Sequence, residues 1–312
     1  MVVDKTYINA LSIEQAHSEA IKCTSGFRYI AGGTDVIVNK FQGNDNAEIL
    51  IDLTGINELK QVVTKENNIE IGALVRLDDL KNYKVIIDNF PALLEAANSV
   101  ASPVIRKTAT LGGNLLCENR CIFYNQTEWW RESAGHCLKC NGNVCIASGG
   151  NKNCFAKFVS DTAVVLISMN ASIEVFADNK ISVIPIEDIY SGDGITPLKL
   201  SKTAIVKSIH IPLNNEYKSV FKKLRQRETL EFSSMTTAVT INKTGKLKIV
   251  LGAVHAKPIV YNGNITDDFN EILNALISNT RIIDNDVYSR AYRKEMITVF
   301  LQRSFKELSL LK

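Results

Sequence analysis

Hydrophobic and polar residues alternate along the chain at spacings that change between those of helices and those of strands. Near the N-terminus, Ser12 opens a capping box, and the residues from there to Cys23 have helical spacing. Two apolar runs, Arg28–Ile30 and Glu48–Leu53, end at glycine-containing turns and predict buried strands. These segments together predict a small α/β unit of about sixty residues.

The middle of the chain continues with mixed elements. Proline at Ser102-Pro103 stops one helix, because it disfavours helical geometry in the preceding residue. The predicted elements are strands at Asn68–Leu74, Ala171–Phe176 and Ile181–Ile184, and helices at Leu77–Asn82, Phe90–Ser99 and Ser160–Met169.

A boundary is predicted at Pro197–Lys202, and beyond it the strands come before the helices, as in an α+β domain. Asn242–Gly245 is a hairpin signal between two of these strands. The predicted elements are strands at Ile205–Ile211, Ser219–Leu224, Thr236–Ile241 and Leu247–Ala253, and helices at Asp268–Ser278 and Asp286–Leu308. The expected units are therefore residues 1–58, 59–200 and 201–312.

Composition narrows the class of protein. Of the 312 residues, 46% are hydrophobic and 22% charged, which is ordinary for a globular protein, and a net charge of +3 gives no reason to expect nucleic acid as a partner. No uncharged apolar run approaches the ~20 residues of a membrane span. Residues 1–5 do not begin a secretory signal, so a cytoplasmic location is expected.

Six of the seven cysteines lie between positions 117 and 154. In a reducing compartment, clustered thiols predict metal or cluster ligands rather than disulfides. Four thiolates can hold a [4Fe–4S] cluster or a structural zinc ion, and the spacings alone do not separate these two. Cys137 and Cys140, taken alone, would look like half of a zinc knuckle.

Two glycine pairs are candidate nucleotide-binding loops. Gly32-Gly33 follows a predicted strand, and successive amides in such a turn can form a nest for phosphate oxygens. Gly112-Gly113 is the second pair. Each pair alone is a weak signal, since many such turns are only tight loops. Neither pair is a Gly-x-Gly-x-x-Gly fingerprint or a P-loop.

The two segments in this order resemble the flavoprotein subunits of the xanthine dehydrogenase family of molybdenum hydroxylases. The family's Ala-Gly-Gly-Thr-Asp loop, which holds the FAD pyrophosphate, stands at Ala31–Asp35. Its Ser-Pro-x-Ile-Arg-x-x-Ala-Thr-x-Gly-Gly-Asn segment, which lies along the flavin, stands at Ser102–Asn114, with Lys107 where asparagine is common. Ser160-Asp161 matches a pair that contacts FAD, and Lys222 matches a lysine near the flavin ring.

The resemblance implies an α+β fold with a two-subdomain FAD-binding domain of the PCMH type. A C-terminal α+β domain like that of carbon monoxide dehydrogenase flavoproteins follows, and the cysteine-rich insertion spans residues 115–159. The implied cofactor-binding residues are Ile30, Ala31, Gly32, Gly33, Thr34, Asp35, Thr108, Ala109, Thr110, Gly112, Gly113, Asn114, Asp161 and Lys222.

Most of these flavoproteins join the second glycine pair to the Ser-Asp pair by a short segment without cysteines. One subgroup, the 4-hydroxybenzoyl-CoA reductases, carries an insertion whose cysteines bind a [4Fe–4S] cluster, and the insertion in this chain is similar in spacing. The resemblance leaves Cys117 and Cys140 as free thiols. The implied cluster ligands are Cys121, Cys137, Cys145 and Cys154.

The resemblance also implies a role. The chain would transfer electrons between a ferredoxin-like carrier, the cluster and FAD. It would do so within a heterotrimer whose small subunit holds [2Fe–2S] clusters and whose large subunit holds molybdenum and reductively dehydroxylates an aromatic CoA thioester. One alternative is the flavin subunit of an oxidising hydroxylase acting on an aldehyde, xanthine, an N-heterocycle or carbon monoxide. A second alternative is a zinc-stabilised nucleotide-binding protein.

Overall fold

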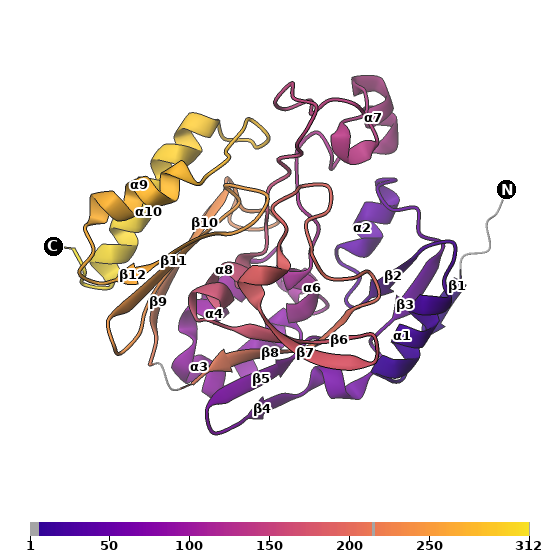
Figure 1. Ribbon diagram of the computed structural model, residues 1–312, viewed down its shortest axis with the longest axis horizontal. Helices are drawn as coiled ribbons and strands as arrows, with labels where there is room; N and C mark the ends of the chain where they lie inside the picture. The colour runs from indigo at the N-terminus through magenta and orange to yellow at the C-terminus, as the bar shows by residue number, and fades with distance from the viewer. Residues whose placement is uncertain (1–5, 214–215, 312) are drawn as a thin grey trace.

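The structure, a computed structural model, describes residues 6–213 and 216–311, so residues 1–5, on which the expectation of no secretory signal depends, lie outside it. The described residues form sheets of three, five and four strands, and each sheet borders a hydrophobic cluster. Figure 1 shows these sheets in chain order from right to left. Helices pack on all three sheets, which confirms the expected α+β class.

The N-terminal unit is a parallel sheet in the order β1-β3-β2. Parallel strands need crossover connections, and the helices α1 and α2 provide them. The Ser12 side chain accepts a hydrogen bond from the amide of Gln15 and so caps α1, as the capping box predicted. The elements are β1 (Thr6–Asn9), α1 (Ile13–Lys22), β2 (Phe27–Ile30), α2 (Val36–Phe41) and β3 (Ile49–Asp52).

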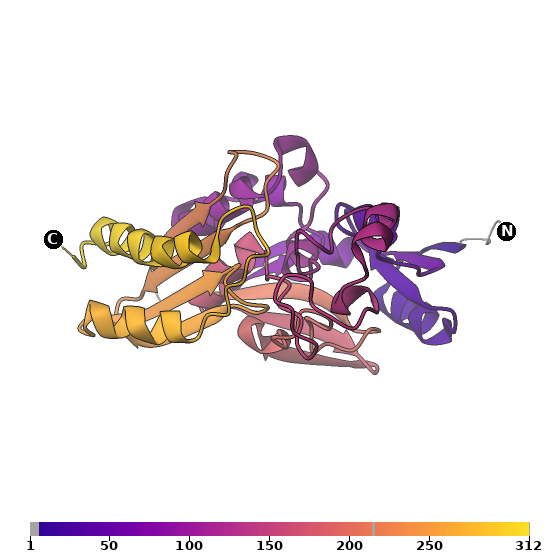
Figure 2. The same ribbon diagram turned by 90° about the horizontal axis from the view of Figure 1, so that it is seen from above.

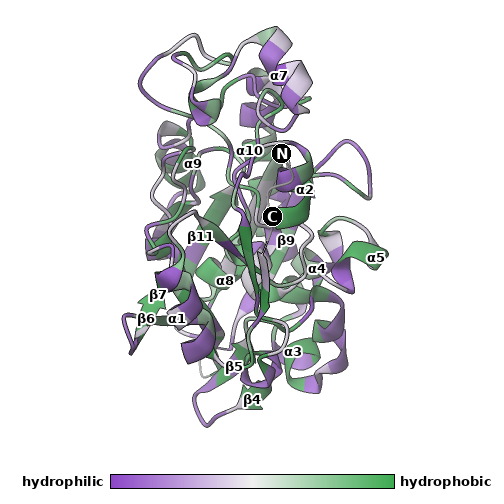
Figure 3. Ribbon diagram, turned by 90° about the vertical axis from the view of Figure 1, so that its right-hand side faces the viewer, coloured by the Kyte–Doolittle hydropathy of each residue, from purple (hydrophilic) through white to green (hydrophobic). Residues whose placement is uncertain are grey.

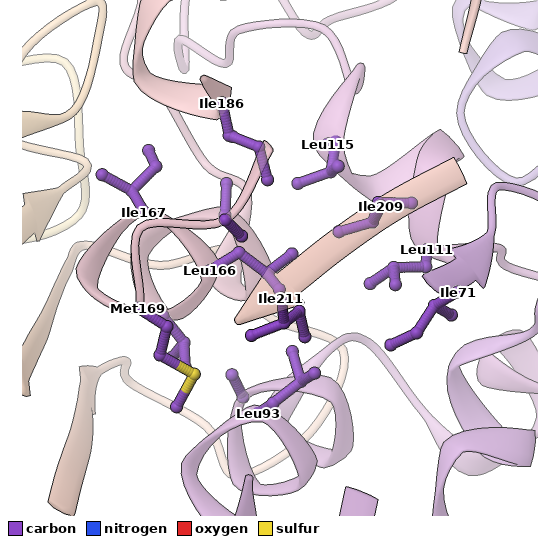
Figure 4. Close-up of a cluster of buried hydrophobic side chains, with 14 of the residues drawn as sticks. Ile71, Leu93, Leu111, Leu115, Leu166, Ile167, Met169, Ile186, Ile209 and Ile211 are labelled. Atoms are coloured by element: carbon purple, nitrogen blue, oxygen red, sulfur yellow. The ribbon is translucent and has the colours of Figure 1, made fainter. Parts of the chain in front are cut away.

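The middle unit is an antiparallel sheet in the order β4-β5-β8-β6-β7. Its largest hydrophobic cluster, part of which Figure 4 shows, joins this sheet to α4, α6 and α8. The strands are β4 (Val62–Thr64), β5 (Asn68–Gly72), β6 (Ser172–Ala177), β7 (Lys180–Pro185) and β8 (Ile205–Pro212). The helices are α3 (Lys84–Asn89), α4 (Pro91–Ser99), α5 (Pro103–Arg106), α6 (Leu111–Leu115) and α8 (Asp161–Ser168).

The strand β8 was predicted as part of the C-terminal unit, but it belongs to the sheet of the middle unit. β8 pairs with β5 and β6, although its hydrophobic pattern placed it beyond the predicted boundary at Pro197–Lys202. Most of its side chains are buried on both faces, so the pattern predicts a buried strand without naming its partners. The division into domains that fold independently stays a prediction.

The C-terminal unit is an antiparallel sheet in the order β12-β11-β10-β9, covered on one face by α9 and α10 (Figures 1 and 2). The other face packs on α4 and α8 of the middle unit. The predicted hairpin is present between β10 and β11. The elements are β9 (Lys218–Leu224), β10 (Met235–Ile241), β11 (Lys246–Gly252), β12 (Ile259–Asn264), α9 (Phe269–Ser278) and α10 (Arg290–Glu307).

The cysteine-rich insertion connects α6 to α8 and contains little regular structure. Its one α-helix is α7 (Glu128–Ala134), which Figure 1 shows above the rest of the molecule. The backbones of Arg120 and Lys157 exchange two hydrogen bonds, of 2.9 and 2.8 Å, and so close the insertion at its base. The 3-10 helices are η1 (Asn57–Lys60), η2 (Leu77–Asn82), η3 (Leu138–Cys140) and η4 (Ile186–Ile189).

Hydrophobic residues concentrate in the inner strands and helices, whereas the outer loops are largely hydrophilic (Figure 3). Within the described part of the chain, no helix combines the length and the apolar character that crossing a membrane requires.

Candidate functional site

The first glycine loop lies between β2 and α2 and is pressed against the second segment. A Cβ on Gly32 would overlap the carbonyl oxygen of Thr108, so only glycine allows the two segments to approach this closely. Gly33 has a φ of +70°, a left-handed conformation that glycine adopts without strain. The structure therefore brings Ala31–Asp35 together with the loop that contains Thr108 and Ala109.

The backbone amides of this loop are free to bind an anion. Those of Gly32, Gly33 and Thr34 donate no hydrogen bond to any described residue, whereas the carbonyl of Gly33 already accepts one from Ile37. Thr34 is exposed. Adjacent unpaired amides beside a φ-positive glycine form an anion-binding nest. The loop can therefore hold the phosphate oxygens of a nucleotide, and its contact with the FAD diphosphate stays a prediction.

The second segment has a different local role, because its amides are already used. The amides of Leu111 and Gly112 donate to the carbonyls of Val75 and Ala73 at 2.8 and 2.9 Å. The Thr110 hydroxyl caps α6 by accepting from the amide of Gly113 at 3.1 Å. These bonds fix the segment against η2 and β5. The unpaired amides therefore belong to the first loop, and the role of this segment beside a cofactor stays a prediction.

Asn114 and Asp161 are fixed at the start of α8. The side-chain oxygen of Asn114 accepts from the hydroxyls of Ser160 and Thr162 at 2.9 and 2.6 Å. Asp161 is 3% exposed, and its carboxylate forms an ion pair with Lys223 at 2.6 Å. The second oxygen of that carboxylate accepts from the hydroxyl of Ser233. Both predicted residues thus serve to attach α8 to its neighbours.

Lys222 does not join this group. Consecutive residues of a strand point to opposite faces, and Lys222 pairs with Glu307 of α10 at 2.5 Å on the far side of β9. Lys223, which the sequence analysis did not select, takes the inner position beside Asp161. Its partner Asp161 lies 62 residues away in the sequence, so no local pattern selects Lys223.

Arg120 is a second residue that the sequence analysis missed. Its guanidinium pairs with the carboxylate of Asp35, which also accepts from the amide of Glu118 at 3.0 Å. Arg120 further contacts Asn39 at 3.3 Å and lies 4.6 Å from the centre of the Phe232 ring. Asp35 therefore ties the glycine loop to the base of the cysteine insertion. No local sequence motif predicts the contact between Arg120 and Asp35, which are 85 residues apart.

The four predicted ligand cysteines line one cavity in the insertion. The cavity is narrow, with a volume of about 10 Å³, and Cys117 and Cys140 do not line it. Its wall includes the aromatic and aliphatic side chains of Phe123, Tyr124 and Ile146. Lys139 lines it as well, with its ammonium group bonded to Glu118 and to the carbonyl of Gly194. The ligand cysteines that line this cavity are Cys121, Cys137, Cys145 and Cys154.

The cysteines do not converge on a single point. Among the described residues, no group of three or more His, Cys, Asp or Glu side chains could hold one metal ion. The expected ligand set for a metal or a cluster therefore stays a prediction that rests on the four cysteines lining one space.

The thiols of the insertion differ in acidity. Cys140 donates a hydrogen bond to the sulfur of Cys137 and, with the amides of Lys139 and Cys140, lowers the pKa of Cys137 to about 6. Burial raises the pKa of Cys154 to about 11 and raises that of Cys121. Burial also raises the pKa of Cys117, which lies outside the cavity. Cys140 thus lowers the pKa of the ligand candidate Cys137 but does not itself line the cavity.

Comparison with known proteins identifies the family to which this chain belongs. Residues 3–214 match the family described as FAD binding domain in molybdopterin dehydrogenase, and the chain belongs to that family. It is a flavin-binding subunit of the molybdenum hydroxylase type of oxidoreductase, so the FAD assignment is confirmed at the level of the family.

Individual relatives agree with this class. The FAD-binding subunit PaoB of an Escherichia coli aldehyde oxidoreductase is 29% identical, over 75% of this chain and 76% of its own. The medium chain of a Sulfolobus acidocaldarius glyceraldehyde dehydrogenase is 23% identical, over 97% of this chain and 98% of its own. These two proteins are named as oxidoreductases or dehydrogenases, which favours the oxidising alternative over the reductase resemblance.

Solved structures share the fold. A chain of carbon monoxide dehydrogenase from Hydrogenophaga pseudoflava superimposes with a TM-score of 0.74 at 18% identity, covering 98% of both chains. Quinoline 2-oxidoreductase from Pseudomonas putida 86 gives a TM-score of 0.74 at 15% identity, covering 97% of this chain and 95% of its own. The expected carbon monoxide dehydrogenase-like architecture is confirmed.

Proposed function

We propose that this chain is the electron-transfer subunit of a molybdenum-containing oxidoreductase and that it holds both FAD and a [4Fe–4S] cluster. The observation that carries the proposal is the cavity in the insertion. Four cysteines spread over that segment line one space, while two others nearby do not.

The first loop and its neighbours fit FAD. The unpaired amides of Gly32, Gly33 and Thr34 would bind the diphosphate, and the segment at Thr108–Asn114 would border the rest of the cofactor. When bound, FAD supplies exchange between two-electron and one-electron chemistry. The Asp161–Lys223 pair fixes α8 beside that space without leaving an uncompensated buried charge.

The cysteine cavity offers the number of ligands that a four-iron cluster needs. Each iron of a [4Fe–4S] cluster takes one thiolate, and four cysteines line the cavity. The buried ammonium group of Lys139, which is paired with Glu118, also lines the cavity. When bound, the cluster supplies one-electron transfer.

The partners follow from the family. No feature assigned in this chain holds molybdenum, so we infer a large subunit with the molybdenum cofactor and a small subunit with [2Fe–2S] clusters, in a heterotrimer. The names of the relatives support an oxidising reaction of an aldehyde or a related substrate in the complex. The proposed place of work is the cytoplasm.

A second candidate function rests on the cysteine cavity alone. A flavin subunit that exchanges electrons only within its complex needs no additional cluster. A cluster at the surface gives a route for a one-electron carrier of the ferredoxin type, as in the 4-hydroxybenzoyl-CoA reductase resemblance. A reductive complex of this kind would share the same FAD and cysteine sites. The zinc-stabilised alternative is disfavoured, because the chain belongs to a flavin-binding oxidoreductase family.

Cysteine substitutions test the proposal. The complex is purified without oxygen, and its flavin, iron and acid-labile sulfide are measured. Replacing any one of the four cavity cysteines by serine is expected to lower iron by up to about four per chain and to remove the broad visible absorbance of the cluster. Cys117→Ser and Cys140→Ser are the matched controls, and both are expected to keep their iron. Loss of iron in a control, or its retention in a cavity variant, would overturn the ligand assignment.

A further inference from the structure

A larger pocket adjoins the cysteine cavity on the side of the C-terminal unit. It is formed by the end of α9, the loop at residues 280–283, the start of α10, and Phe155 of the insertion. Its volume is about 530 Å³. Nothing in the proposed FAD or cluster sites uses this pocket.

The pocket and the cysteine cavity share a wall. Phe155 and Ile283 line both spaces, and Phe155 directly follows the ligand candidate Cys154. The side-chain amide of Asn285, which is 2% exposed, donates to the carbonyl of Phe155 at 2.8 Å and fixes that residue between the two spaces. A molecule seated in the pocket is thus separated from the cysteine cavity by about one layer of side chains.

The lining of the pocket is cationic. Arg281, Arg290 and Lys294 all line it and are exposed to solvent. Arg290 lies 3.7 Å from the exposed carboxylate of Asp284, whereas Lys294 forms no ion pair with any described residue. The exposed Glu295 is the other acid at this turn of α10.

The positive character extends beyond the pocket. Burial lowers the pKa of His255, and the nearby charges of Lys257 and Arg281 lower it further, so these cations lie close enough to interact. Lys257 is exposed, as is Arg281. The surface beside the shared wall therefore carries an excess of positive charge.

We propose that this pocket and its cationic rim form the docking site of an acidic one-electron carrier protein. The inference rests on the proposed cluster, which accepts or gives single electrons. Each encounter would transfer one electron past Phe155. One partner, the carrier or the cluster, is oxidised by one electron, and the other is reduced by one. A nicotinamide donor would instead deliver a hydride and would have to reach the flavin. Charge complementarity at such a rim mainly accelerates association and makes it sensitive to salt.

Charge reversal tests the docking site in the intact complex. The triple variant Arg281→Glu, Arg290→Glu, Lys294→Glu is compared with a matched control of three exposed lysines on the middle unit, Lys180→Glu, Lys199→Glu, Lys202→Glu. The probe is an acidic bacterial-type ferredoxin. Binding is measured by calorimetry without turnover at low and high salt, and electron exchange is followed by stopped flow. Reduced methyl viologen, a cation, serves as the reductant that needs no acidic docking.

In the pocket variant, binding of the ferredoxin and the second-order rate are expected to fall by roughly tenfold or more at low salt. The dependence of this rate on salt concentration should also become weaker. The iron content, the flavin content and the rate of reduction by the viologen should equal those of the control. Equal binding and equal rates in the pocket variant and the control would overturn the docking site. Failure of the cluster proposal appears separately, as missing iron in the unmodified complex, and binding of the ferredoxin still reports on the pocket in that case.

Discussion

At the scale of single residues, the glycines of the first loop do two different things. Gly32 allows contact with the backbone of Thr108, and Gly33 allows a left-handed turn that exposes the amides. The sequence motif does not distinguish these roles, because both positions are simply glycine. The structure separates them and makes Gly32 the more sensitive position for the contact between the two segments.

We expect Gly32→Ala to remove most of the bound FAD, because the added Cβ would force the backbone at Thr108 away from the loop. Gly26→Ala is the control, since Gly26 has a φ of +89° and open space around it. The control should cost about 1 kcal/mol of stability through backbone strain and should keep its flavin. Flavin released by denaturation is measured for both variants. Equal flavin content in the two proteins would contradict this role of Gly32.

Two neighbouring lysines provide a second comparison at this scale. Lys223→Met would leave the carboxylate of Asp161 buried and unpaired, with an expected loss of about 3 kcal/mol in the free energy of unfolding. Lys222→Met breaks an exposed pair with Glu307 and should cost about 1 kcal/mol or less. Urea unfolding of both variants measures the difference. A larger loss for Lys222→Met would reverse the assignment of inner and outer faces.

The limits of prediction at this scale have a physical origin. The glycine segments could be found because close backbone approach restricts those positions to one residue type. Lys223 and Arg120 could not be selected in the same way, since their partners Asp161 and Asp35 lie far away in the sequence. A long-range ion pair leaves no pattern in either of the segments that it joins.

At the scale of elements, amphipathic segments were predictable and their partners were not. The helix expected from Ser12 to Cys23 is α1, Ile13–Lys22, and the expected hairpin joins β10 to β11. Pro103 was predicted to stop the preceding helix. In the structure it also begins the short helix α5, because proline is favoured at the first position of a helix. β8 was recognised as a strand, but hydrophobic periodicity carries no information about which sheet a buried strand joins.

The two ends of the insertion meet at Arg120 and Lys157, so it should be removable. Its other contacts with the rest of the chain, such as the bond from Lys139 to the carbonyl of Gly194, would be lost with it. We expect a chain in which residues 121–156 are replaced by Asn-Gly to fold and to keep FAD without binding iron. The Arg120–Lys157 backbone pair provides the antiparallel ends that a two-residue turn can join. Arg120 would keep its contact with Asp35. Flavin and iron content of the purified chain are measured, and loss of flavin would show that the insertion is part of the FAD site.

At the scale of the whole molecule, α8 connects the parts. All eight of its residues are buried, and it packs against both the middle and the C-terminal units. The start of this helix lies beside the second glycine segment through Asn114, and it reaches β9 through Lys223. The first loop belongs to the N-terminal unit, so the candidate FAD site draws residues from the N-terminal and middle units, while Lys223 of the C-terminal unit holds the start of α8 in place.

A ligand held between the N-terminal and middle units should stabilise the whole chain, because α8 joins the middle unit to the C-terminal unit. At a free concentration one hundred times its dissociation constant, FAD would contribute about 2.7 kcal/mol to the free energy of unfolding. For a chain of this size, that contribution corresponds to a rise of roughly 5 °C in the unfolding midpoint. The measurement is thermal unfolding of flavin-depleted protein with and without added FAD. Gly32→Ala should show almost no rise, whereas the variant without the insertion should respond like the unmodified chain. A midpoint that does not change with FAD in the unmodified chain would contradict the binding of FAD by this chain.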